Sequence, residues 1–264
     1  MRRLALTLVT ISSPFALASC AGLSSDTEPP LQPPVLCSTD TTTRDAMIHD
    51  ALLSHPEWLM EMSQAMRQRQ QAAQQQTAKQ AIAQNHDTLF ADPADPVAGN
   101  PAGAVTVVLF FDASCPYCKQ VSPDIDRLMQ ENPDVRVIFK EFPILGPASQ
   151  LAATAGLASL KQGKYDAFHR ALMADKTPEH QLAEPHLMEI AKSVGLDGVR
   201  LKKDMSSPEI AQKLAANIEL GHRLGITGTP GLIIGDRLTP GAMPYAAMVE
   251  AVATARASQS AENR

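Results

Sequence analysis

The sequence predicts an α/β domain with a partly parallel β-sheet, a helical insertion and an N-terminal helical extension. An apolar, β-branched run at 105–111 indicates a buried strand, and strand character recurs at 135–140. A helical pattern at 116–130 connects the two runs, which predicts a βαβ unit and therefore parallel pairing. About 80 helical residues then follow before strand character returns at 231–235.

The remaining elements complete an order of β-α-β, a helical block and β-β-α. We expect helices in the block at 148–160, 165–174, 184–194 and 208–224. A short strand at 237–239 and a last helix at 245–255 follow the strand at 231–235. This order is that of a thioredoxin-like core over 104–257, with the helical insertion at about 147–224 and a tail at 258–264.

The first 19 residues have the pattern of an export signal. Arg2 and Arg3 precede an apolar stretch, 4–17, that is too short to remain as a membrane span. The stretch ends in Leu17-Ala18-Ser19-Cys20, which resembles the lipobox of bacterial lipoproteins. The resemblance implies cleavage before Cys20, lipidation of its sulfur and a periplasmic protein anchored to the outer membrane. The alternative is an ordinary signal peptide.

A tether is expected at 20–43, where two Pro-Pro pairs stand among Ser, Thr and Asp. Cys37 lies within it. It is either a spare thiol or a partner for an intermolecular or redox contact.

Residues 44–90 carry the pattern of an N-terminal helical extension. Apolar residues recur at helical spacing, and Pro56 begins a second helix whose later part is rich in Gln. The apolar seam is too short for a strong coiled coil. A solvent-exposed helix and a homo-oligomerisation segment through 44–84 therefore both remain open. Turn-forming residues then predict a linker at 91–103.

Composition and charge exclude several classes of protein. The formal net charge of −5 argues against a nucleic-acid partner. Four cysteines are too few for a disulfide scaffold in 264 residues. Of these four, only Cys115 and Cys118 are close enough in sequence to act together.

The motif Cys115-Pro116-Tyr117-Cys118 falls between the first strand and the following helix. The free backbone N–H groups of a first helical turn favour a thiolate, and such motifs show thiol pKa values of roughly 3.5–7.5. We therefore expect Cys115 to be the nucleophile and Cys118, one turn into the helix, to resolve the mixed disulfide. Pro116 suits the first helical position.

A metal or cofactor is not expected at this motif. Zinc would need two further ligands, and no two histidines have a paired spacing. Cu(I), which accepts two thiolates, remains open. His169 is expected to pack within its helix rather than to bind a ligand.

Three segments resemble the DsbA-type thiol–disulfide oxidoreductases, and the nearest branch is that of the ScsC proteins. The segments are Phe110-Phe111-Asp112-Ala113-Ser114-Cys115-Pro116-Tyr117-Cys118, Lys140-Glu141-Phe142-Pro143-Ile144-Leu145-Gly146 and Gly228-Thr229-Pro230. The resemblance covers about 89–255. The N-terminal helical extension of the ScsC branch resembles His55-Pro56-Glu57-Trp58-Leu59 and the residues that follow.

The resemblance implies that Pro230 is a cis proline facing the cysteine pair. It also implies that Thr229 binds extended substrate through its backbone and tunes the redox potential. Leu109 stands where family members commonly carry a buried acid. We therefore expect water, or neighbours such as Lys140 and Glu141, to assist deprotonation of Cys118.

The leading hypothesis is an enzyme that acts on thiols and disulfides of exported proteins, with a membrane redox partner. Oxidation, isomerisation and reduction remain open, because redox potential and oligomeric state decide among them. Two alternatives stand beside it. One is a Cu(I)-binding thiol protein of copper or redox stress tolerance, and the other is a lipid-anchored interaction protein with a degenerate site.

Overall fold

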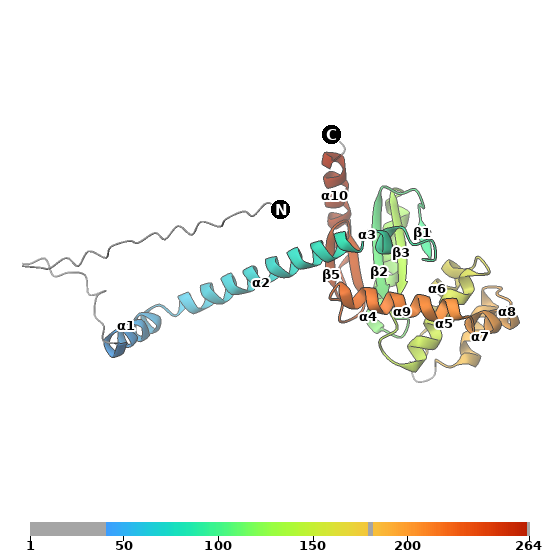
Figure 1. Ribbon diagram of the computed structural model, residues 1–264, viewed down its shortest axis with the longest axis horizontal. Coiled ribbons are helices and arrows are strands. Elements are labelled where there is room, and N and C mark those ends of the chain that lie inside the picture. Colours follow the sequence, from blue (N-terminus) through green and yellow to red (C-terminus); the bar gives the residue numbers. More distant parts are fainter. Residues whose placement is uncertain (1–40, 179–181, 263–264) are drawn as a thin grey trace, which may run out of the picture. The chain divides into compact units, whose positions relative to one another are not determined.

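Five strands form the mixed sheet on which the site is built, in the order β1-β3-β2-β4-β5 (Figure 1). The computed structural model describes residues 41–178 and 182–262. The strands are β1 (Val97–Gly99), β2 (Val105–Phe111), β3 (Val135–Glu141), β4 (Gly231–Ile234) and β5 (Arg237–Pro240). Only β2 and β3 are parallel, and every other neighbouring pair is antiparallel. The described elements therefore have the predicted thioredoxin-like order.

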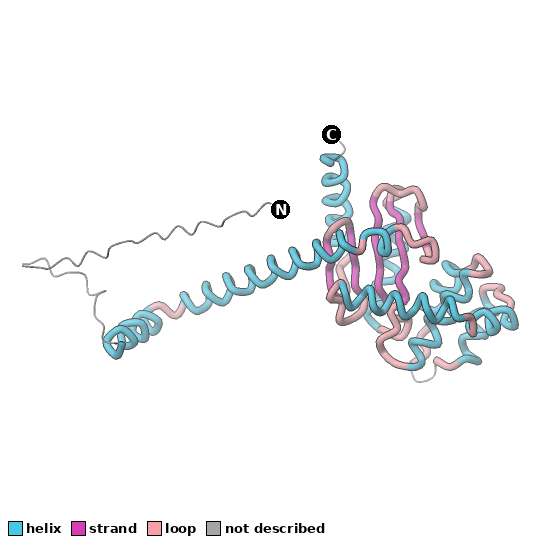
Figure 2. Tube along the Cα trace, in the orientation of Figure 1, coloured by secondary structure: helices cyan, strands magenta, loops and turns pink. Residues whose placement is uncertain are grey.

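The sheet is covered by helices on both faces, as the tube view shows (Figure 2). Along β2, Leu109 and Phe111 enter the larger core, whereas Val108 and Phe110 enter a second core on the opposite face. The larger core contains apolar residues of α4 (Pro116–Glu131) and α10 (Tyr245–Glu262). The second core contains residues of α2 (Glu57–Gln84), α3 (His86–Phe90) and α9 (Pro208–Arg223). Burial on both faces explains the continuous apolar run of β2.

Helix α4 and the parallel strands form the predicted βαβ unit. Val105 pairs with Val135 and Phe111 pairs with Glu141, so the two strands end at the same edge of the sheet. Helix α4 buries the residues Cys118, Val121, Ile125 and Leu128. This 3–4 spacing produces one apolar face and places Cys118 at its first turn, at the carboxyl end of β2.

Among its described residues, the helical insertion contains one helix more than the sequence pattern predicted. It comprises α5 (Pro147–Leu160), α6 (Tyr165–Ala174), α7 (Glu184–Ser193), α8 (Gly198–Met205) and α9. The prediction missed α8 because it is short and buries only Leu201. Asp197 caps it, since its carboxylate accepts the backbone N–H of Arg200 at 3.0 Å.

Three predicted boundaries were wrong. The linker at 91–103 contains β1, which is too short to show a period and is defined by pairing of Val97 with Ile138. The tether prediction extended to residue 43, but α1 (Thr41–Ser54) begins at Thr41. The tail prediction began at 258, but α10 continues to Glu262 because no Gly or Pro follows Ala255.

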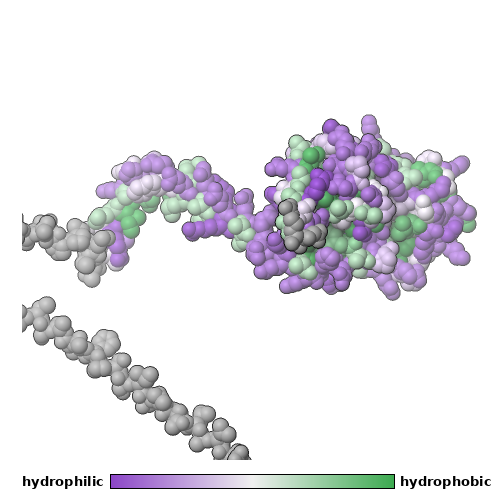
Figure 3. Space-filling view, turned by 90° about the horizontal axis from the view of Figure 1, so that it is seen from above, coloured by the Kyte–Doolittle hydropathy of each residue, from purple (hydrophilic) through white to green (hydrophobic). Residues whose placement is uncertain are grey.

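The chain divides into two units, and the second begins at Met62, within the residues of α2. The first unit contains α1, which buries none of its residues. Within the second unit, α2 buries Ile82 in the second core. Apolar side chains remain exposed on the N-terminal helices (Figure 3). No helix in the described part of the chain is both long and apolar enough to cross a membrane.

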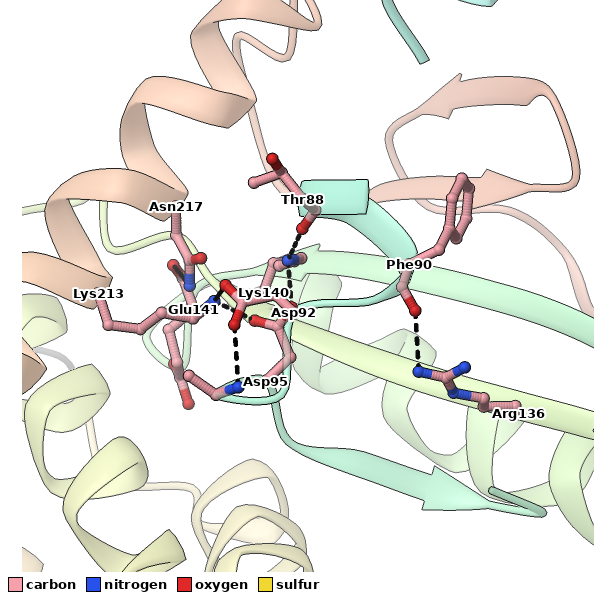
Figure 4. Close-up of polar contacts among 10 residues, drawn as sticks. Thr88, Phe90, Asp92, Asp95, Arg136, Lys140, Glu141, Lys213 and Asn217 are labelled. Carbon is pink, nitrogen blue, oxygen red and sulfur yellow. Dashed lines mark hydrogen bonds and ion pairs between the residues drawn. The ribbon is translucent and has the colours of Figure 1, made fainter. Parts of the chain in front are cut away.

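A network of two lysines and two aspartates, of which Lys140 and Asp95 are buried, joins the segment after α3 to β3 and α9 (Figure 4). The ammonium of Lys140 pairs with Asp95 and donates to the backbone oxygen of Thr88 at 2.6 Å. Lys213 pairs with Asp92 at 2.5 Å and with Asp95 at 2.6 Å. Burial lowers the pKa of Lys140, and the charge and hydrogen bond of Asp95 oppose that effect. Each buried charge thus has an opposite partner.

Candidate active site

Cys115 lies between the end of β2 and the start of α4. It is the residue before the first helical position, and its backbone N–H donates to the oxygen of Asp112 at 3.0 Å. Cys118 follows within the first turn, and both thiols are free and buried. Pro116 occupies the first helical position, and Tyr117 is exposed beside it. The backbone N–H groups of the first turn of α4, which favour a thiolate, therefore follow Cys115 directly.

The loop before β4 brings Thr229 and Pro230 to the cysteines. The peptide bond between them is cis, as the family resemblance implies. Antiparallel pairing of Phe110 with Gly231 places this loop beside the end of β2. The thiol of Cys115 donates to the backbone oxygen of Thr229 at 3.3 Å. The structure thus brings the cis-proline loop to the cysteine motif through the contact of Cys115 with Thr229.

The surroundings of Cys118 favour its neutral thiol. Burial raises the pKa of Cys118 well above its ordinary value, and the charge of Cys115 acts in the same direction. Hydrogen bonds from the backbone of Asp112 and from the side chain of Thr229 oppose the increase in pKa. Cys118 is therefore a protected thiol whose thiolate is supported by two hydrogen bonds.

The expectation that Lys140 and Glu141 assist Cys118 was wrong. Lys140 belongs to the lysine–aspartate network on the opposite face of the sheet. Glu141 accepts the phenol hydroxyl of Tyr165 at 2.9 Å, and burial raises the pKa of its carboxyl. Leu109 belongs to the larger core, and in the sheet it pairs with Phe139 of β3. The hydrogen bonds to the sulfur of Cys118 come instead from Asp112 and Thr229.

Asp112 is a site residue that the sequence reasoning missed. Its buried carboxylate accepts backbone N–H groups of Ser114 at 2.8 Å, Ile144 at 2.9 Å and Leu145 at 3.1 Å. These bonds hold the loop before Cys115 against the loop after β3. The available signal was a single carboxylate immediately after an apolar strand.

His169 packs in the core, as predicted. Its ring contacts Phe111, Phe139 and Tyr165, with centroid distances of 4.8, 4.4 and 5.7 Å. Burial lowers its pKa to about 4. Among the described residues, no group of three or more His, Cys, Asp or Glu side chains could hold a metal ion. Cys20 and Cys37 lie outside the described residues.

A dithiol at a helix start, facing a cis proline on a thioredoxin-like sheet, defines a thiol–disulfide oxidoreductase. The sequence family described as "Thioredoxin" matches residues 91–254. A second family, described as "Copper resistance protein ScsC N-terminal domain", matches residues 45–73. The chain belongs to the thioredoxin family and, within it, to the DsbA-like oxidoreductases of the ScsC branch.

Two solved structures illustrate this relationship. A thioredoxin-like oxidoreductase from Silicibacter pomeroyi is 44% identical, with a TM-score of 0.63, and covers 65% of this chain and 98% of its own. A linker-deletion variant of ScsC from Proteus mirabilis is 30% identical, with a TM-score of 0.64. That match covers 84% of this chain and 100% of the variant, so it includes part of the N-terminal extension.

Curated relatives include disulfide bond formation proteins and Na(+)/H(+) antiporters. The probable disulfide bond formation protein D of Bacillus anthracis is 30% identical over 162 residues, which are 57% of this chain and 74% of that protein. The Na(+)/H(+) antiporter NhaA 3 of Salinispora tropica is 29% identical over 172 residues, or 63% of this chain. The chain spans only 26% of that antiporter's length.

Proposed function

We propose that this protein exchanges disulfides with exported proteins, using Cys115 as nucleophile and Cys118 as resolving thiol. The observation that carries the proposal is the 3.3 Å hydrogen bond from the Cys115 thiol to the backbone of Thr229. An extended substrate that pairs with the backbone of Thr229 would bring its own cysteine to the sulfur of Cys115.

The proposed reaction has two thiol–disulfide exchanges. The Cys115 thiolate attacks a substrate disulfide, which forms a mixed disulfide and releases the other substrate sulfur as a thiolate. The Cys118 thiolate then attacks the sulfur of Cys115, which releases the second substrate thiol and leaves the Cys115–Cys118 disulfide. The substrate is reduced and the protein is oxidised, and the reverse sequence oxidises a substrate dithiol.

Trapping and turnover assays test the residue roles. Cys118→Ser should accumulate mixed disulfides with a model substrate, because the second exchange is blocked, whereas Cys115→Ala should form none. Insulin reduction and reactivation of scrambled ribonuclease measure turnover. Equal behaviour of the wild type and Cys115→Ala in both assays would contradict the proposal and favour an interaction protein with a degenerate site.

We further propose that the N-terminal helices join copies of the chain and thereby favour isomerisation or reduction over oxidation. Large apolar side chains are exposed along α1 and the first half of α2, namely Met47, Ile48, Leu53, Trp58, Leu59, Met60, Met62 and Met66. The match to the ScsC N-terminal domain covers this stretch. A second copy would bury an apolar surface that water otherwise contacts.

Light scattering tests this assembly. The wild-type chain should have the mass of an oligomer, and Leu59→Glu combined with Met62→Glu should reduce it to that of a monomer. Isomerase activity with scrambled ribonuclease should fall with the mass. A monomeric wild type, or unchanged isomerase activity in the monomeric variant, would contradict this part of the proposal.

We also propose that the mature protein is periplasmic and anchored to the outer membrane through lipid on Cys20, with a membrane redox partner. The argument is the lipobox-like sequence before Cys20 and the need for more than one acyl chain for stable anchoring. A solved relative from Salmonella enterica is described as a periplasmic thioredoxin-like protein. Cys20→Ser should abolish palmitate labelling and release the protein from the membrane fraction.

Binding of Cu(I) is a second candidate function. The family name attached to residues 45–73 refers to copper resistance, and two neighbouring thiols suit Cu(I). Anaerobic Cu(I) titration of the wild type and of Cys115→Ser decides this question. Tight binding that requires Cys115, in a protein without disulfide exchange, would favour copper binding over exchange.

A further inference from the structure

A groove opens directly beside the nucleophile, between α4 and the end of α6. Its volume is 860 Å³, and Ser114 and Pro116, the two neighbours of Cys115 in the chain, both line it. Leu145 and Met173 contribute apolar surface, and Lys119 and Lys176 contribute cations. We call this feature the α4–α6 groove. Its volume is that of a site for several side chains rather than one.

Several charged side chains that line the α4–α6 groove already have partners within the protein. Arg170 pairs with Asp126 at 2.8 Å and with Asp166 at 3.0 Å. The carboxylate of Asp175 lies 3.1 Å from Nε2 of His186 and accepts the hydroxyl of Thr177 at 3.1 Å. Arg170 and Asp175 are therefore already engaged by other side chains of the protein.

Lys119 is different, because it is half-buried and lacks an ion pair with any carboxylate of the described residues. Its ammonium donates to the backbone oxygen of Asp175 at 2.6 Å. An ammonium has three donors, so two remain for other partners. Burial lowers the pKa of Lys119, and the charge of Asp175 partly offsets this effect. Lys176, exposed at the same groove, adds a second cation.

Apolar surface lies next to these cations. Leu145 is 43% exposed although it is large and apolar, and its backbone is fixed by Asp112. Pro123 lies inside α4 and also lines the groove, and it has no N–H to donate to the carbonyl of Lys119 four residues earlier. The groove therefore combines an apolar wall with cationic groups.

We propose that the α4–α6 groove binds the part of a substrate chain that adjoins the cysteine bonded to Cys115, and that it selects segments with an acidic side chain. The inference rests on the proposed disulfide exchange and adds a substrate class to it. A substrate carboxylate would pair with Lys119, which forms no ion pair with the carboxylates of the described residues. Charge pairing of this kind sets specificity more than affinity. Apolar substrate residues would contact Leu145.

The test uses short peptides with one cysteine, each held as a mixed disulfide with the chromogenic thiol 2-nitro-5-thiobenzoate. Attack of the Cys115 thiolate on the peptide sulfur forms the Cys115–peptide disulfide and releases the coloured thiolate. Glu, Gln and Lys are placed in turn at positions on both sides of the cysteine. The readout is the ratio of second-order rate constants for the Glu and Gln peptides, since a ratio cancels changes in thiol reactivity.

We expect the wild type to prefer Glu over Gln by about three- to tenfold on one side of the cysteine, with Lys slowest. The preference should fall at high salt, because partly exposed charges are screened. Lys119→Gln combined with Lys176→Gln should reduce the ratio to about one. Lys192→Gln, a matched removal of an exposed lysine from α7, should leave it unchanged.

The other outcomes distinguish failure of the α4–α6 groove proposal from failure of the proposed disulfide exchange. A Glu-to-Gln ratio of one in the wild type, with all peptides reacting, would overturn the α4–α6 groove proposal and leave the disulfide exchange intact. Survival of the ratio in the double-lysine variant would also overturn it, because the acid would then be recognised elsewhere. Failure of the wild type to release chromophore from any peptide would overturn the proposed function itself.

Discussion

Thr229 contacts the two active-site sulfurs with different atoms. Its backbone oxygen accepts the thiol of Cys115 at 3.3 Å, whereas its side chain hydrogen-bonds Cys118. Every residue type carries the backbone oxygen, but only the hydroxyl can be removed by substitution. One position therefore allows the support of the resolving thiol to be tested separately from the contact with the nucleophile.

Thr229→Val should slow the resolving step, because it keeps the branched shape and removes the hydroxyl. Without that hydrogen bond the pKa of Cys118 should rise further, and a rise of one unit lowers the thiolate population about tenfold. Stopped-flow decay of a preformed mixed disulfide on Cys115 measures the step. Thr239→Val, on β5, is the matched control. Equal decay rates in all three proteins would show that the hydroxyl has no role.

The lysine–aspartate network predicts a large loss of stability when one buried partner is removed. Asp95→Asn leaves the buried Lys140 ammonium without its carboxylate, and breaking such a pair costs about 3–5 kcal/mol. Urea unfolding measures the loss. Glu184→Gln breaks the exposed pair with Lys202 and should cost at most about 1 kcal/mol. Similar losses in both variants would contradict a special role for burial.

The features that sequence predicted here are encoded locally. The strand β2, the start of α4 and the cysteines between them follow from one continuous segment whose apolar period changes from strand to helix. The cis bond before Pro230 was implied by the resemblance of a three-residue motif. These features can be predicted without knowing which distant segments pack against them.

The features that sequence missed depend on register between distant segments. Lys140 and Glu141 are neighbours in β3, so they point to opposite faces, and only pairing of Phe111 with Glu141 reveals which face each occupies. Strand β1 exists because β3 offers it a free edge. The three amides that Asp112 binds include two from a loop that begins about 30 residues later.

Acid should destabilise the protein through His169. Its pKa is about 4 in the fold and 6.5 ordinarily, so as pH falls below 6.5 the unfolded chain takes up the proton first. The contribution of His169 to the free energy of unfolding is fully present above pH 6.5. It decreases as the pH falls to 4, by about 3 kcal/mol in total.

The measurement is the urea midpoint of unfolding between pH 7 and pH 4. His169→Gln should start less stable, because the ring contacts are lost, but its midpoint should fall less with pH than that of the wild type. His49→Gln, at an exposed histidine of α1, should follow the wild type. Parallel pH curves for the wild type and His169→Gln would contradict the assignment of this loss to His169.

Alanine should destabilise the protein at one of two helical glycines but not at the other. A Cβ on Gly221, in α9, would lie 2.4 Å from ring carbon Cε2 of Phe142, whose side chain is buried in the second core. Overpacking of this kind costs about 1–3 kcal/mol and should exceed the gain of up to about 1 kcal/mol from alanine's helix propensity. Gly198, in α8, has only Met188 Sδ at 3.8 Å, so Gly198→Ala should be neutral or stabilising.

The displaced ring in Gly221→Ala should also affect exchange chemistry. Phe142 directly precedes the loop whose amides at Ile144 and Leu145 bind Asp112, and Asp112 in turn supports the sulfur of Cys118. The resolving step should therefore be slower in Gly221→Ala and unchanged in Gly198→Ala, measured on folded protein at low temperature. A variant that is destabilised but resolves mixed disulfides at the wild-type rate would show that the Asp112 loop is held independently of Phe142.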